Sequence, residues 1–545
     1  MDSSSLAILF PFLGGLGMFL IGMMLLTDGL MSFGGHTIKQ ALARFTGTPA
    51  KAFASGTLAT AVAQSSTATT VTLIGFVSAG LVSFPQAIGV LLGASLGNTA
   101  TGWIVAGLGL KVNLGFYTMP MIGLGALMKL LARGRWAGLG LALAGFGVMF
   151  AGLAALQEGM RGLASIFDLA SLPVGGVRER LATMTIGLVL TALLQSSTAA
   201  IAATLTALHA QAINFDQAAA LVVGAAIGTT LTGALVAIAG TVHAKRTALA
   251  YVLFNLIAGL VAIALLPVFL AAIEWLEVHV RLEAGAMSLA AFHTLFIAVG
   301  VVLLLPFAHP FARLVERLLP ARGEVLTERL DHSMLAIPAV ALEASQRSLE
   351  AIAAHLLALY DGMLSGADVD DTGRRLAQAG QVLDAVYDFV SRIELAAGDE
   401  AGSAQRVAQL HAIDHLLRLR TRLDELARAR VDLSEPAYEW AMPNTRLILD
   451  LARQGLALAD LGQQVPQIAR EAQALEALSH RMRHGALAGA LPGAQSPAQA
   501  LTRTDAFRWL ERIGGHVSRI CHYLSEGRGA KQRAATRRRP PPSPA

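Results

Sequence analysis

The tetrapeptide Gln-Ser-Ser-Thr occurs twice in this sequence, each time inside a long apolar stretch. Its residues are Gln64, Ser65, Ser66 and Thr67 in the first copy, and Gln195, Ser196, Ser197 and Thr198 in the second. Amide and hydroxyl oxygens are suitable ligands for a hard cation, and their hydrogens can be donated to an oxyanion. The two copies therefore carry the side chains that would bind a cation and an anion together.

The apolar stretches around these copies predict two broken helices. Residues 52–80 contain no charged side chain, and residues 183–209 contain none apart from His209. Residues 52–63 would form about 18 Å of helix, which reaches the middle of a bilayer core about 30 Å thick. We therefore expect each tetrapeptide to be the tip of a re-entrant helical hairpin. A tip of this kind leaves backbone groups unpaired, so it must lie inside protein or beside a water-filled cavity.

The two helix ends at such a tip differ in chemistry. The start of the second half-helix presents N–H groups and a positive dipole end, which favour an anion. The end of the first half-helix presents carbonyl oxygens, which favour a cation. The alternative is that these Ser and Thr residues only hydrogen-bond between packed helices. Two copies at equivalent positions of a repeat favour the binding site.

An internal repeat relates the two copies, which are 131 residues apart (195 minus 64). The same offset pairs Gly56 with Gly187 and Gly93-Ala94 with Gly224-Ala225, among other matches. Further upstream the offset becomes 130, and it pairs Gly17, Gly22 and Gly29 with Gly147, Gly152 and Gly159. Matches sustained over so many positions indicate a duplication.

The composition indicates a membrane protein. The chain has 545 residues, of which 54% are hydrophobic and 14% charged, whereas a soluble protein averages about 25% charged residues. Seven full spans are expected: Leu6–Leu30, Gln86–Leu108, Leu114–Leu131, Ala137–Leu156, Gln217–Gly240, Ala248–Leu270 and Met287–Leu305. The first has no Lys or Arg before it, which favours a retained span over a secretory signal.

The distribution of basic residues predicts the orientation of these spans. Lys and Arg cluster at 39–51, 129–135, 245–246 and 313–322, and the positive-inside rule places all four clusters in the cytoplasm. If both hairpins return to their own side, the N-terminus lies outside and the two repeats are inverted. Inverted repeats with broken helices are typical of secondary transporters, whose binding site lies near the bilayer midplane.

Further polar residues could line such a site. "GASLGNT" (93–99) contains Asn98 and Thr99, and "GAAIGTT" (224–230) contains Thr229 and Thr230. These segments could instead be close-packed helix faces, and the sequence gives the two interpretations about equal weight. Asn255 in "LFN" could equally link helices by hydrogen bonds or line a cavity.

These motifs, together with "AKRTALAYVLFN" and "AFHTLF", resemble the bacterial sodium/phosphate cotransporter family related to the type II Na/Pi cotransporters. The resemblance covers residues 6–306. It implies Na⁺-coupled transport of inorganic phosphate, with both tetrapeptides in the Na⁺ and phosphate sites. The family often has Asn where Ser95, Ala226 and Ile297 stand here. From the residues alone, only an anion–cation symporter follows.

The remainder of the chain is predicted to be a soluble helical bundle. Leu416, Leu419, Leu423 and Leu426 form one of several apolar stripes with helical spacing, and about six helices are expected. This half resembles a PhoU-like domain, a family of paired three-helix bundles that can bind metals through acidic clusters. Asp384 and Asp388 could share a metal on one helix face, although a solvated surface is favoured. The Arg-rich stretch 416–430 has Asp and Glu partners, so no nucleic acid is expected.

The predicted fold class is therefore all-α, a polytopic membrane protein with inverted repeats and two re-entrant hairpins, followed by a soluble helical bundle. The expected organisation is a transport domain at 1–306, a linker at 307–326, a cytosolic PhoU-like bundle at 327–528 and a disordered basic tail at 529–545. Within the transport domain, the two repeats are expected at 6–135 and 137–270 and the final span at 287–305. The helical bundle could make regulatory or homo-oligomeric contacts.

The leading hypothesis for function is Na⁺-coupled phosphate transport in the bacterial inner membrane. The alternatives are a phosphate exporter, a transporter of another oxyanion, and a membrane-tethered phosphate sensor. The expected partners are inorganic phosphate, Na⁺ and the lipid bilayer. An enzyme is not expected, because the apolar half has no nucleophile–base pair and no Walker motif. Na⁺ is the expected coupling ion, and no organic cofactor is expected.

Overall fold

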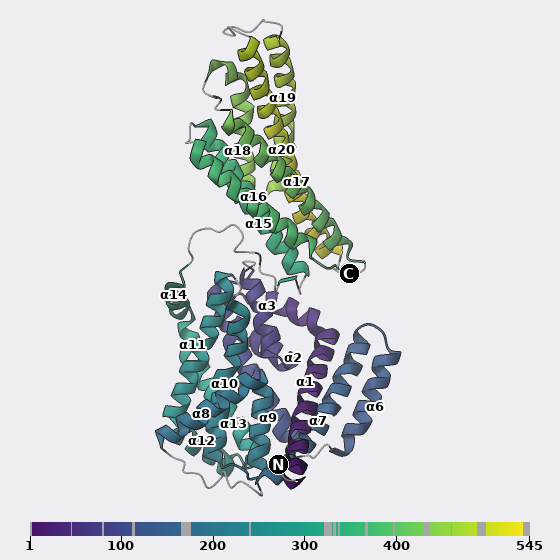
Figure 1. Cartoon of the computed structure of the whole chain (residues 1–545), viewed down its shortest axis with the longest axis vertical. Helices are drawn as coiled ribbons and strands as arrows, with labels where there is room; N and C mark the ends of the chain where they lie inside the picture. The colour runs from purple at the N-terminus through teal and green to yellow at the C-terminus, as the bar shows by residue number, and fades with distance from the viewer. Residues whose placement is uncertain are drawn as a thin grey trace, which may run out of the picture. The chain divides into compact units, whose positions relative to one another are not determined.

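The chain folds into two compact units, residues 1–321 and 322–545 (Figure 1). The computed structural model describes residues 3–44, 46–78, 81–111, 115–164, 176–238, 241–320, 330, 334–335, 338–365, 369–395, 398–429, 431, 433, 435–458, 460–487 and 497–537. Throughout these residues the regular structure is helical, which confirms the predicted all-α class.

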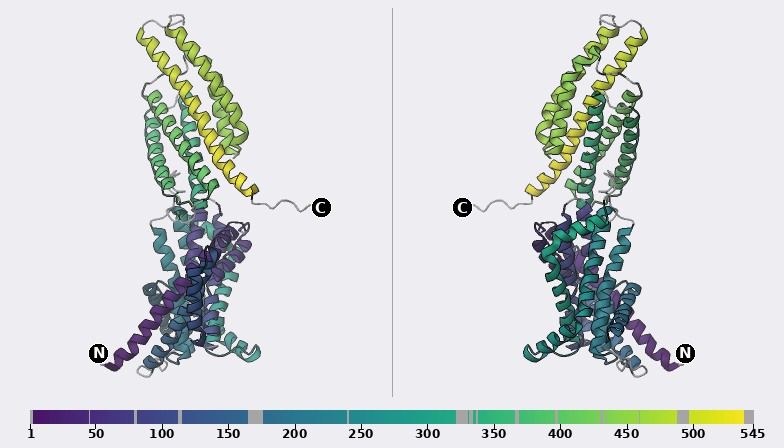
Figure 2. Two further views of the ribbon diagram at one scale, coloured as in Figure 1. Left: turned by 90° about the vertical axis from the view of Figure 1, so that its right-hand side faces the viewer. Right: turned by 90° about the vertical axis from the view of Figure 1, so that its left-hand side faces the viewer.

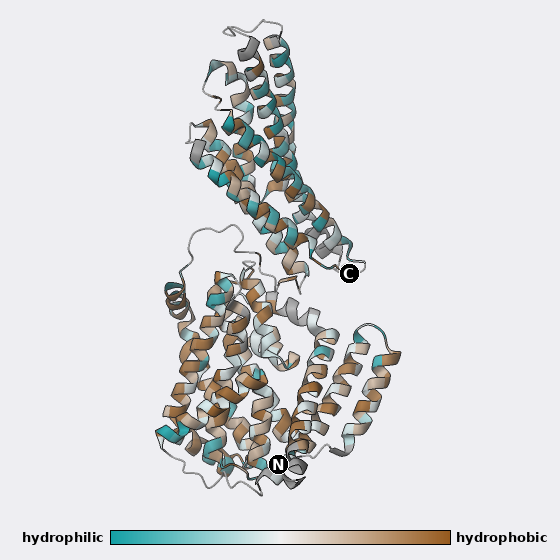
Figure 3. Cartoon of the chain, viewed as in Figure 1, coloured by the Kyte–Doolittle hydropathy of each residue, from teal (hydrophilic) through white to brown (hydrophobic). Residues whose placement is uncertain are grey.

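The first unit contains α1 (Ser3–Arg44), α2 (Pro49–Ala63), α3 (Ser66–Ser78), α4 (Phe84–Asn98), α5 (Ala100–Trp103), η1 (Ile104–Lys111), α6 (Gly115–Leu131), α7 (Arg135–Ala164), α8 (Val177–Leu194), α9 (Ser197–His209), α10 (Phe215–Ile238), α11 (Val242–Ala264), α12 (Leu266–His279), α13 (Ala286–Leu304), η3 (Leu305–Phe307) and α14 (Ala308–Leu318). Figure 3 shows that apolar residues cover most of these helices, as expected for helices surrounded by lipid and by one another.

Six helical stretches of the described chain are long and apolar enough to cross a membrane: Phe10–Gly35, Phe84–Leu110, Arg135–Gly162, Phe215–Leu235, Val242–Ala264 and Ala286–Leu318. They overlap six of the seven expected spans. The other expected span, Leu114–Leu131, corresponds to α6, which has only 17 residues. The expected span Ala248–Leu270 is displaced toward the N-terminus, because α11 runs from Val242 to Ala264. A new helix, α12, begins at Leu266, and Pro267 lies in its first turn.

Each tetrapeptide lies at a break between two helices, as the sequence predicted. The backbone of Gln64 after α2 and of Gln195 after α8 is left-handed, with φ of 53° and 49°. This conformation ends a helix at once, and it costs a residue other than glycine about 1–2 kcal/mol. Near the first break, the Thr60 hydroxyl donates to the Thr69 hydroxyl at 2.9 Å. The end of α2 therefore lies beside the start of α3.

Glycines allow α1 and α7 to pack at backbone distance. A Cβ atom on Gly22 would lie 2.2 Å from the Met149 nitrogen, and one on Gly152 would lie 2.3 Å from the Phe19 nitrogen. These two contacts are equivalent under the 130-residue offset. Further equivalent contacts are Gly29 with Ala142 and Gly159 with Phe12, then Gly15 with Leu156 and Gly145 with Leu26. The helices are therefore antiparallel and related by a local two-fold axis.

The glycines of "GASLGNT" and "GAAIGTT" have the same role in the hairpin units. A Cβ atom on Gly93 of α4 would lie 2.1 Å from the Phe53 oxygen of α2. The equivalent atom on Gly224 of α10 would lie 1.9 Å from the Met184 oxygen of α8. The close-packing interpretation of these two segments is thus correct for their glycines, which hold α4 against α2 and α10 against α8.

The second unit contains α15 (Pro338–Leu364), α16 (Val369–Ser391), α17 (Glu400–Arg428), η5 (Pro436–Ala441), α18 (Met442–Ala457), α19 (Leu461–Leu487) and α20 (Pro497–Arg537). Helices α15 to α17 pack on one another, as do α18 to α20, and α17 packs against α20. Figure 2 shows these long helices from two sides. The predicted Leu stripe of α17 is buried in their common core.

Two expected segment assignments were wrong in extent. The expected linker 307–326 contains helix α14, because Phe311, Ala312 and Val315 form an apolar face that is buried within the first unit. The expected disordered tail 529–545 begins too early, because α20 continues to Arg537. Residues 538–545 lie outside the described residues.

The packing of α1 on α7 leads to a prediction about Gly22. We expect Gly22→Ala to lower the melting temperature of the purified full chain, because the new methyl group meets backbone atoms that cannot rotate away. Overpacking of this kind costs about 1–3 kcal/mol. Gly17→Ala on the same helix is the control, since a Cβ atom there would meet nothing within 4 Å. Equal melting temperatures for both variants would contradict the close packing.

The backbone at Gln195 leads to a second prediction. Gln195→Gly and Gln195→Ala both remove the side chain, but only glycine adopts the left-handed conformation without cost. We expect the glycine variant to be more stable by about 1 kcal/mol. At Ser55, inside α2, substitution by the same two residues should give the opposite order of stability, with Ser55→Ala more stable than Ser55→Gly by about 1 kcal/mol. Thermal unfolding of the four variants tests this, and the same order at both positions would rule out the left-handed break.

Candidate functional site

Both tetrapeptides line one cavity of about 320 Å³ in the first unit. Its walls are Leu20, Met23, Met24, Thr27 and Asp28 of α1; Gln64, Ser65, Ser66 and Thr67 of the first break; Leu194, Gln195, Ser196, Ser197 and Thr198 of the second; and Asn98 and Thr229. The two breaks are far apart in sequence, and the repeat packing brings them together. Ten of the thirteen residues expected at the transport site therefore meet at this cavity.

The serines at the two breaks have two different roles. The Ser65 hydroxyl accepts a hydrogen bond from the Ala68 N–H at 3.1 Å, and the Ser196 hydroxyl accepts one from the Ala199 N–H at 3.2 Å. Both residues thus cap the helices that follow them. Ser66 and Ser197 are the first residues of α3 and α9. The N-termini of two helices, with their unpaired N–H groups, therefore lie at the same cavity.

The two glutamines differ in how firmly they are held. The Gln64 side chain is 9% exposed, its oxygen accepts from the Thr101 hydroxyl at 2.8 Å, and its amide donates to the Ala61 carbonyl. The Gln195 side chain is exposed, and no described residue forms a hydrogen bond with it. One amide is fixed while the other is free to turn toward a ligand, so the two tips are chemically unequal despite their matching backbones.

Asn98 and Thr229 occupy equivalent positions in the two repeats, and both line the cavity. The Asn98 amide donates to the Ser197 hydroxyl at 3.4 Å, which links the first repeat to the tip of the second. The Thr229 hydroxyl donates to the Ala225 carbonyl of its own helix at 3.0 Å. In these two segments the glycines pack helices, whereas one polar residue of each lines the cavity.

Three expected residues do not line the cavity. The hydroxyls of Thr99 and Thr230 both donate, at 2.8 Å, to backbone carbonyls three residues earlier. Thr99 also accepts from the Thr294 hydroxyl at 3.1 Å. The Asn255 amide donates to the Tyr251 carbonyl at 3.0 Å, and its side chain is buried. All three side chains are buried.

Sequence reasoning missed the wall that α1 contributes. Five α1 residues line the cavity, and two of them, Thr27 and Asp28, are polar. Asp28 is the one charged residue between Phe10 and Gly35, a stretch that is apolar enough to span a membrane. That isolated charge was a detectable signal, because ionisable residues within membrane spans are functional candidates by default.

The expected metal pair of the second unit remains a prediction. Asp384 and Asp388 lie one turn apart on α16, and both are exposed. Asp388 forms an ion pair with Arg392 at 2.9 Å. Among the residues that the structure describes, these two carboxylates do not belong to a group of three potential metal ligands, so the structure adds no support for a site here.

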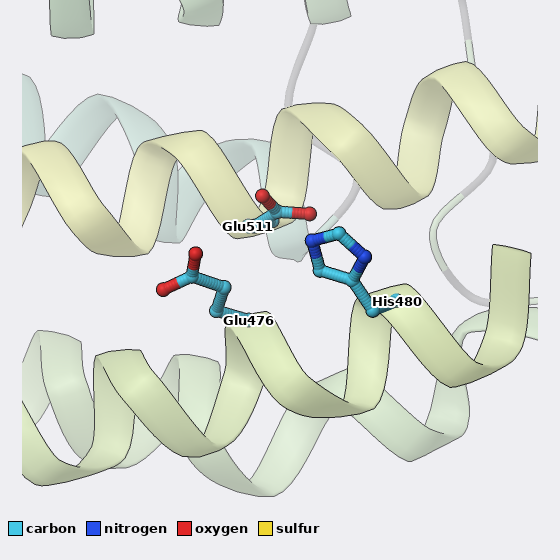
Figure 4. A group of neighbouring side chains, drawn as sticks. All are labelled: Glu476, His480 and Glu511. Carbon is cyan, nitrogen blue, oxygen red and sulfur yellow. The ribbon is translucent and has the colours of Figure 1, made fainter.

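A different group in the second unit brings potential metal ligands together. Figure 4 shows Glu476 and His480 of α19 facing Glu511 of α20. One potential ligand atom from each lies within 4.8 Å of the others. However, Glu511 also accepts from the Ser479 hydroxyl at 2.8 Å and pairs with Arg483 at 3.5 Å. Both partners contact Oε2 of Glu511, and exposed acidic groups commonly occur without an ion, so we assign no ion to the group.

Histidines also meet between α17 and α20. The Nδ1 atoms of His415 and His516 are 3.3 Å apart, and the His415 ring stacks on Tyr523. Burial, reinforced by nearby arginines and by His415, lowers the pKa of His516 to about 4. Burial also lowers the pKa of His415. Both imidazoles are therefore neutral at pH 7, and the pair contributes to the packing of the second unit.

Comparison with known proteins agrees with the sequence motifs. The family model described as Na+/Pi-cotransporter matches residues 18–158 and 175–319, which is more than half of the chain. Each of the two matched segments contains one tetrapeptide. No solved structure matches the chain.

Two curated relatives extend this result. "Uncharacterized protein YqeW" of Bacillus subtilis is 33% identical over 305 residues, which are 56% of this chain and 96% of that protein. "Putative inorganic phosphate export protein YjbB" of Escherichia coli K12 is 27% identical over 354 residues, which are 63% of this chain and 62% of that protein. The resemblance seen in the motifs is thereby confirmed: this chain is a multi-pass membrane protein that belongs to the Na+/Pi-cotransporter family.

Proposed function

We propose that this protein is a sodium-coupled secondary transporter of inorganic phosphate and that the cavity between the two breaks is its binding site. The observation that carries the proposal is the meeting of both Gln-Ser-Ser-Thr segments at one cavity. Polar groups and broken helices are costly in an apolar unit, so their convergence favours a ligand site over packing alone.

The helix starts at the cavity supply the chemistry for an anion. The N-termini of α3 and α9 each present unpaired N–H groups and a positive dipole end. The hydroxyls of Ser66, Thr67, Ser197 and Thr198 add donors that can rotate toward phosphate oxygens. Phosphate has four oxygens, so donors arriving from two tips can hold it on opposite sides.

The same cavity supplies oxygen ligands for a cation. The Asn98 and Gln195 amides and the Thr229 hydroxyl are neutral oxygen donors, and α1 adds the Asp28 carboxylate. Such a set suits a hard cation, and it lacks the thiolate and imidazole ligands that softer metals prefer. Sodium is therefore the coupling ion we propose, in agreement with the family description.

The repeat supports alternating access around this cavity. Helices α1 and α7 pack antiparallel, and the glycine contacts between α2 and α4 recur between α8 and α10. Repeats that are inverted in the membrane allow one half to rock against the other around a fixed site. We further propose that both hairpins are re-entrant in the bacterial inner membrane and that the second unit is a cytoplasmic regulatory domain.

The direction of transport has a second candidate. The relative YjbB bears the name "Putative inorganic phosphate export protein", and this chain covers 62% of its length. The same site could carry phosphate outward if the cation gradient or the phosphate gradient favoured it. Measuring uptake and efflux in the same vesicles separates the two directions.

Transport in liposomes tests the proposed function. We expect the full chain to take up radiolabelled phosphate under an inward Na⁺ gradient and not under a K⁺ gradient. Ser66→Ala and Ser197→Ala should each reduce the initial rate by about tenfold or more, the effect of one lost donor to a charged ligand. Ser55→Ala on α2, outside the cavity, is the matched control and should transport normally.

Other outcomes would redirect the proposal. Normal rates in both serine variants would remove the tips from the binding site. Uptake that is equal in Na⁺ and K⁺ would contradict sodium coupling. If folded protein moves no phosphate in either direction with any cation, transport fails, and the membrane-tethered sensor becomes the leading hypothesis.

A further inference from the structure

We propose that Asp28 binds the coupling cation and that its negative charge makes phosphate binding depend on that cation. This inference rests on the proposed function of the cavity. Asp28 is the one ionisable residue among the sixteen that line it. The other fifteen are apolar or neutral polar, so this carboxylate sets the charge of the site.

The position of Asp28 in α1 makes an unpaired charge costly. Asp28 lies within the apolar stretch Phe10–Gly35, about 10 Å along the helix from Gly35, where that stretch ends. Among the residues that the structure describes, no basic side chain forms an ion pair with Asp28. A carboxylate in such a stretch is retained when it faces a water-filled cavity or meets a counter-ion. The cavity provides the first condition, and a bound cation would provide the second.

The residue equivalent to Asp28 in the second copy of the repeat has a counter-ion, which Asp28 lacks among the described residues. Under the 130-residue offset Asp28 corresponds to Glu158 of α7, and the glycine that follows each of them is also conserved between the two copies. Glu158 pairs with Arg161 at 3.8 Å, and both side chains are largely exposed. The residue equivalent to Arg161 in the first copy is Met31. Asp28, which lines the cavity, therefore has no counter-ion from the described residues of its own helix, whereas Glu158, which lies outside the cavity, has one.

A carboxylate beside an anion site has a clear electrostatic consequence. In the absence of a cation it repels phosphate, which is itself negative at neutral pH. A sodium ion held by Asp28 and by neutral oxygens of the cavity removes the repulsion and attracts the anion. Binding of either ion then strengthens binding of the other by the same factor, which is the coupling a symporter needs.

Equilibrium binding to the purified full chain tests this inference. The quantity is the ratio of the phosphate dissociation constant in KCl to that in NaCl at equal ionic strength. For the unaltered protein we expect a ratio of about ten or more, a typical coupling strength. For Asp28→Asn, whose side chain has the same shape without the charge, the ratio should fall close to one. Asp28→Glu should keep a ratio clearly above that of the Asn variant.

Glu158→Gln is the matched control, because it removes the equivalent carboxylate from outside the cavity. Its ratio should equal that of the unaltered protein. A second readout needs no phosphate: NaCl should raise the melting temperature relative to KCl in the unaltered protein and in Glu158→Gln, but not in Asp28→Asn. If this shift depends on Asp28 while phosphate fails to bind at all, the cation site stands and the proposed function fails.

Three results would overturn the inference. The first is an Asp28→Asn variant that is folded and keeps the full sodium dependence of phosphate binding. The second is an equal loss of sodium dependence in Glu158→Gln. The third is phosphate binding that follows pH instead of Na⁺ and loses that dependence in Asp28→Asn, which would make a proton the cation.

Discussion

Hydrogen bonding of the backbone in an apolar unit is the constraint on which this structure depends. Each break, at Gln64 and at Gln195, frees carbonyls at the end of one helix and N–H groups at the start of the next. Serine side chains at both breaks satisfy one N–H each, and the residues of both breaks line the cavity. The breaks are stable because the cavity exists, and the cavity is polar because the breaks line it.

Close glycine packing is what brings the two breaks together. Glycines hold α1 against α7, α2 against α4, and α8 against α10 at backbone distance. Within an apolar environment, association depends on such close contact, because burial of apolar surface from water contributes little. The repeated contacts give the first unit a local two-fold relation. One feature departs from it: Asp28 of α1 lines the cavity, whereas its counterpart Glu158 lies outside the cavity and pairs with Arg161.

The second unit follows a different principle, that of a water-soluble bundle. Its helices carry apolar stripes that meet in one core, and their exposed faces carry ion pairs within single helices such as Asp388–Arg392 and Asp414–Arg418. Surface pairs of this kind contribute little to stability, so the bundle depends on its buried Leu, Ile and Val residues. A polar group there, the His415–His516 pair, is kept neutral by burial.

The sequence by itself determined the all-helical class, the duplication, the positions of both breaks and the family, because each depends on local patterns: apolar run length, glycine spacing and repeated tetrapeptides. Only the tertiary structure decided which polar residues meet. Asn98 and Thr229 line the cavity, while their neighbours Thr99 and Thr230 bond to their own helices, a difference of about 100° around a helix. The Asp28 wall also required the structure, because the packing of α1 beside two breaks far away in sequence leaves no local pattern.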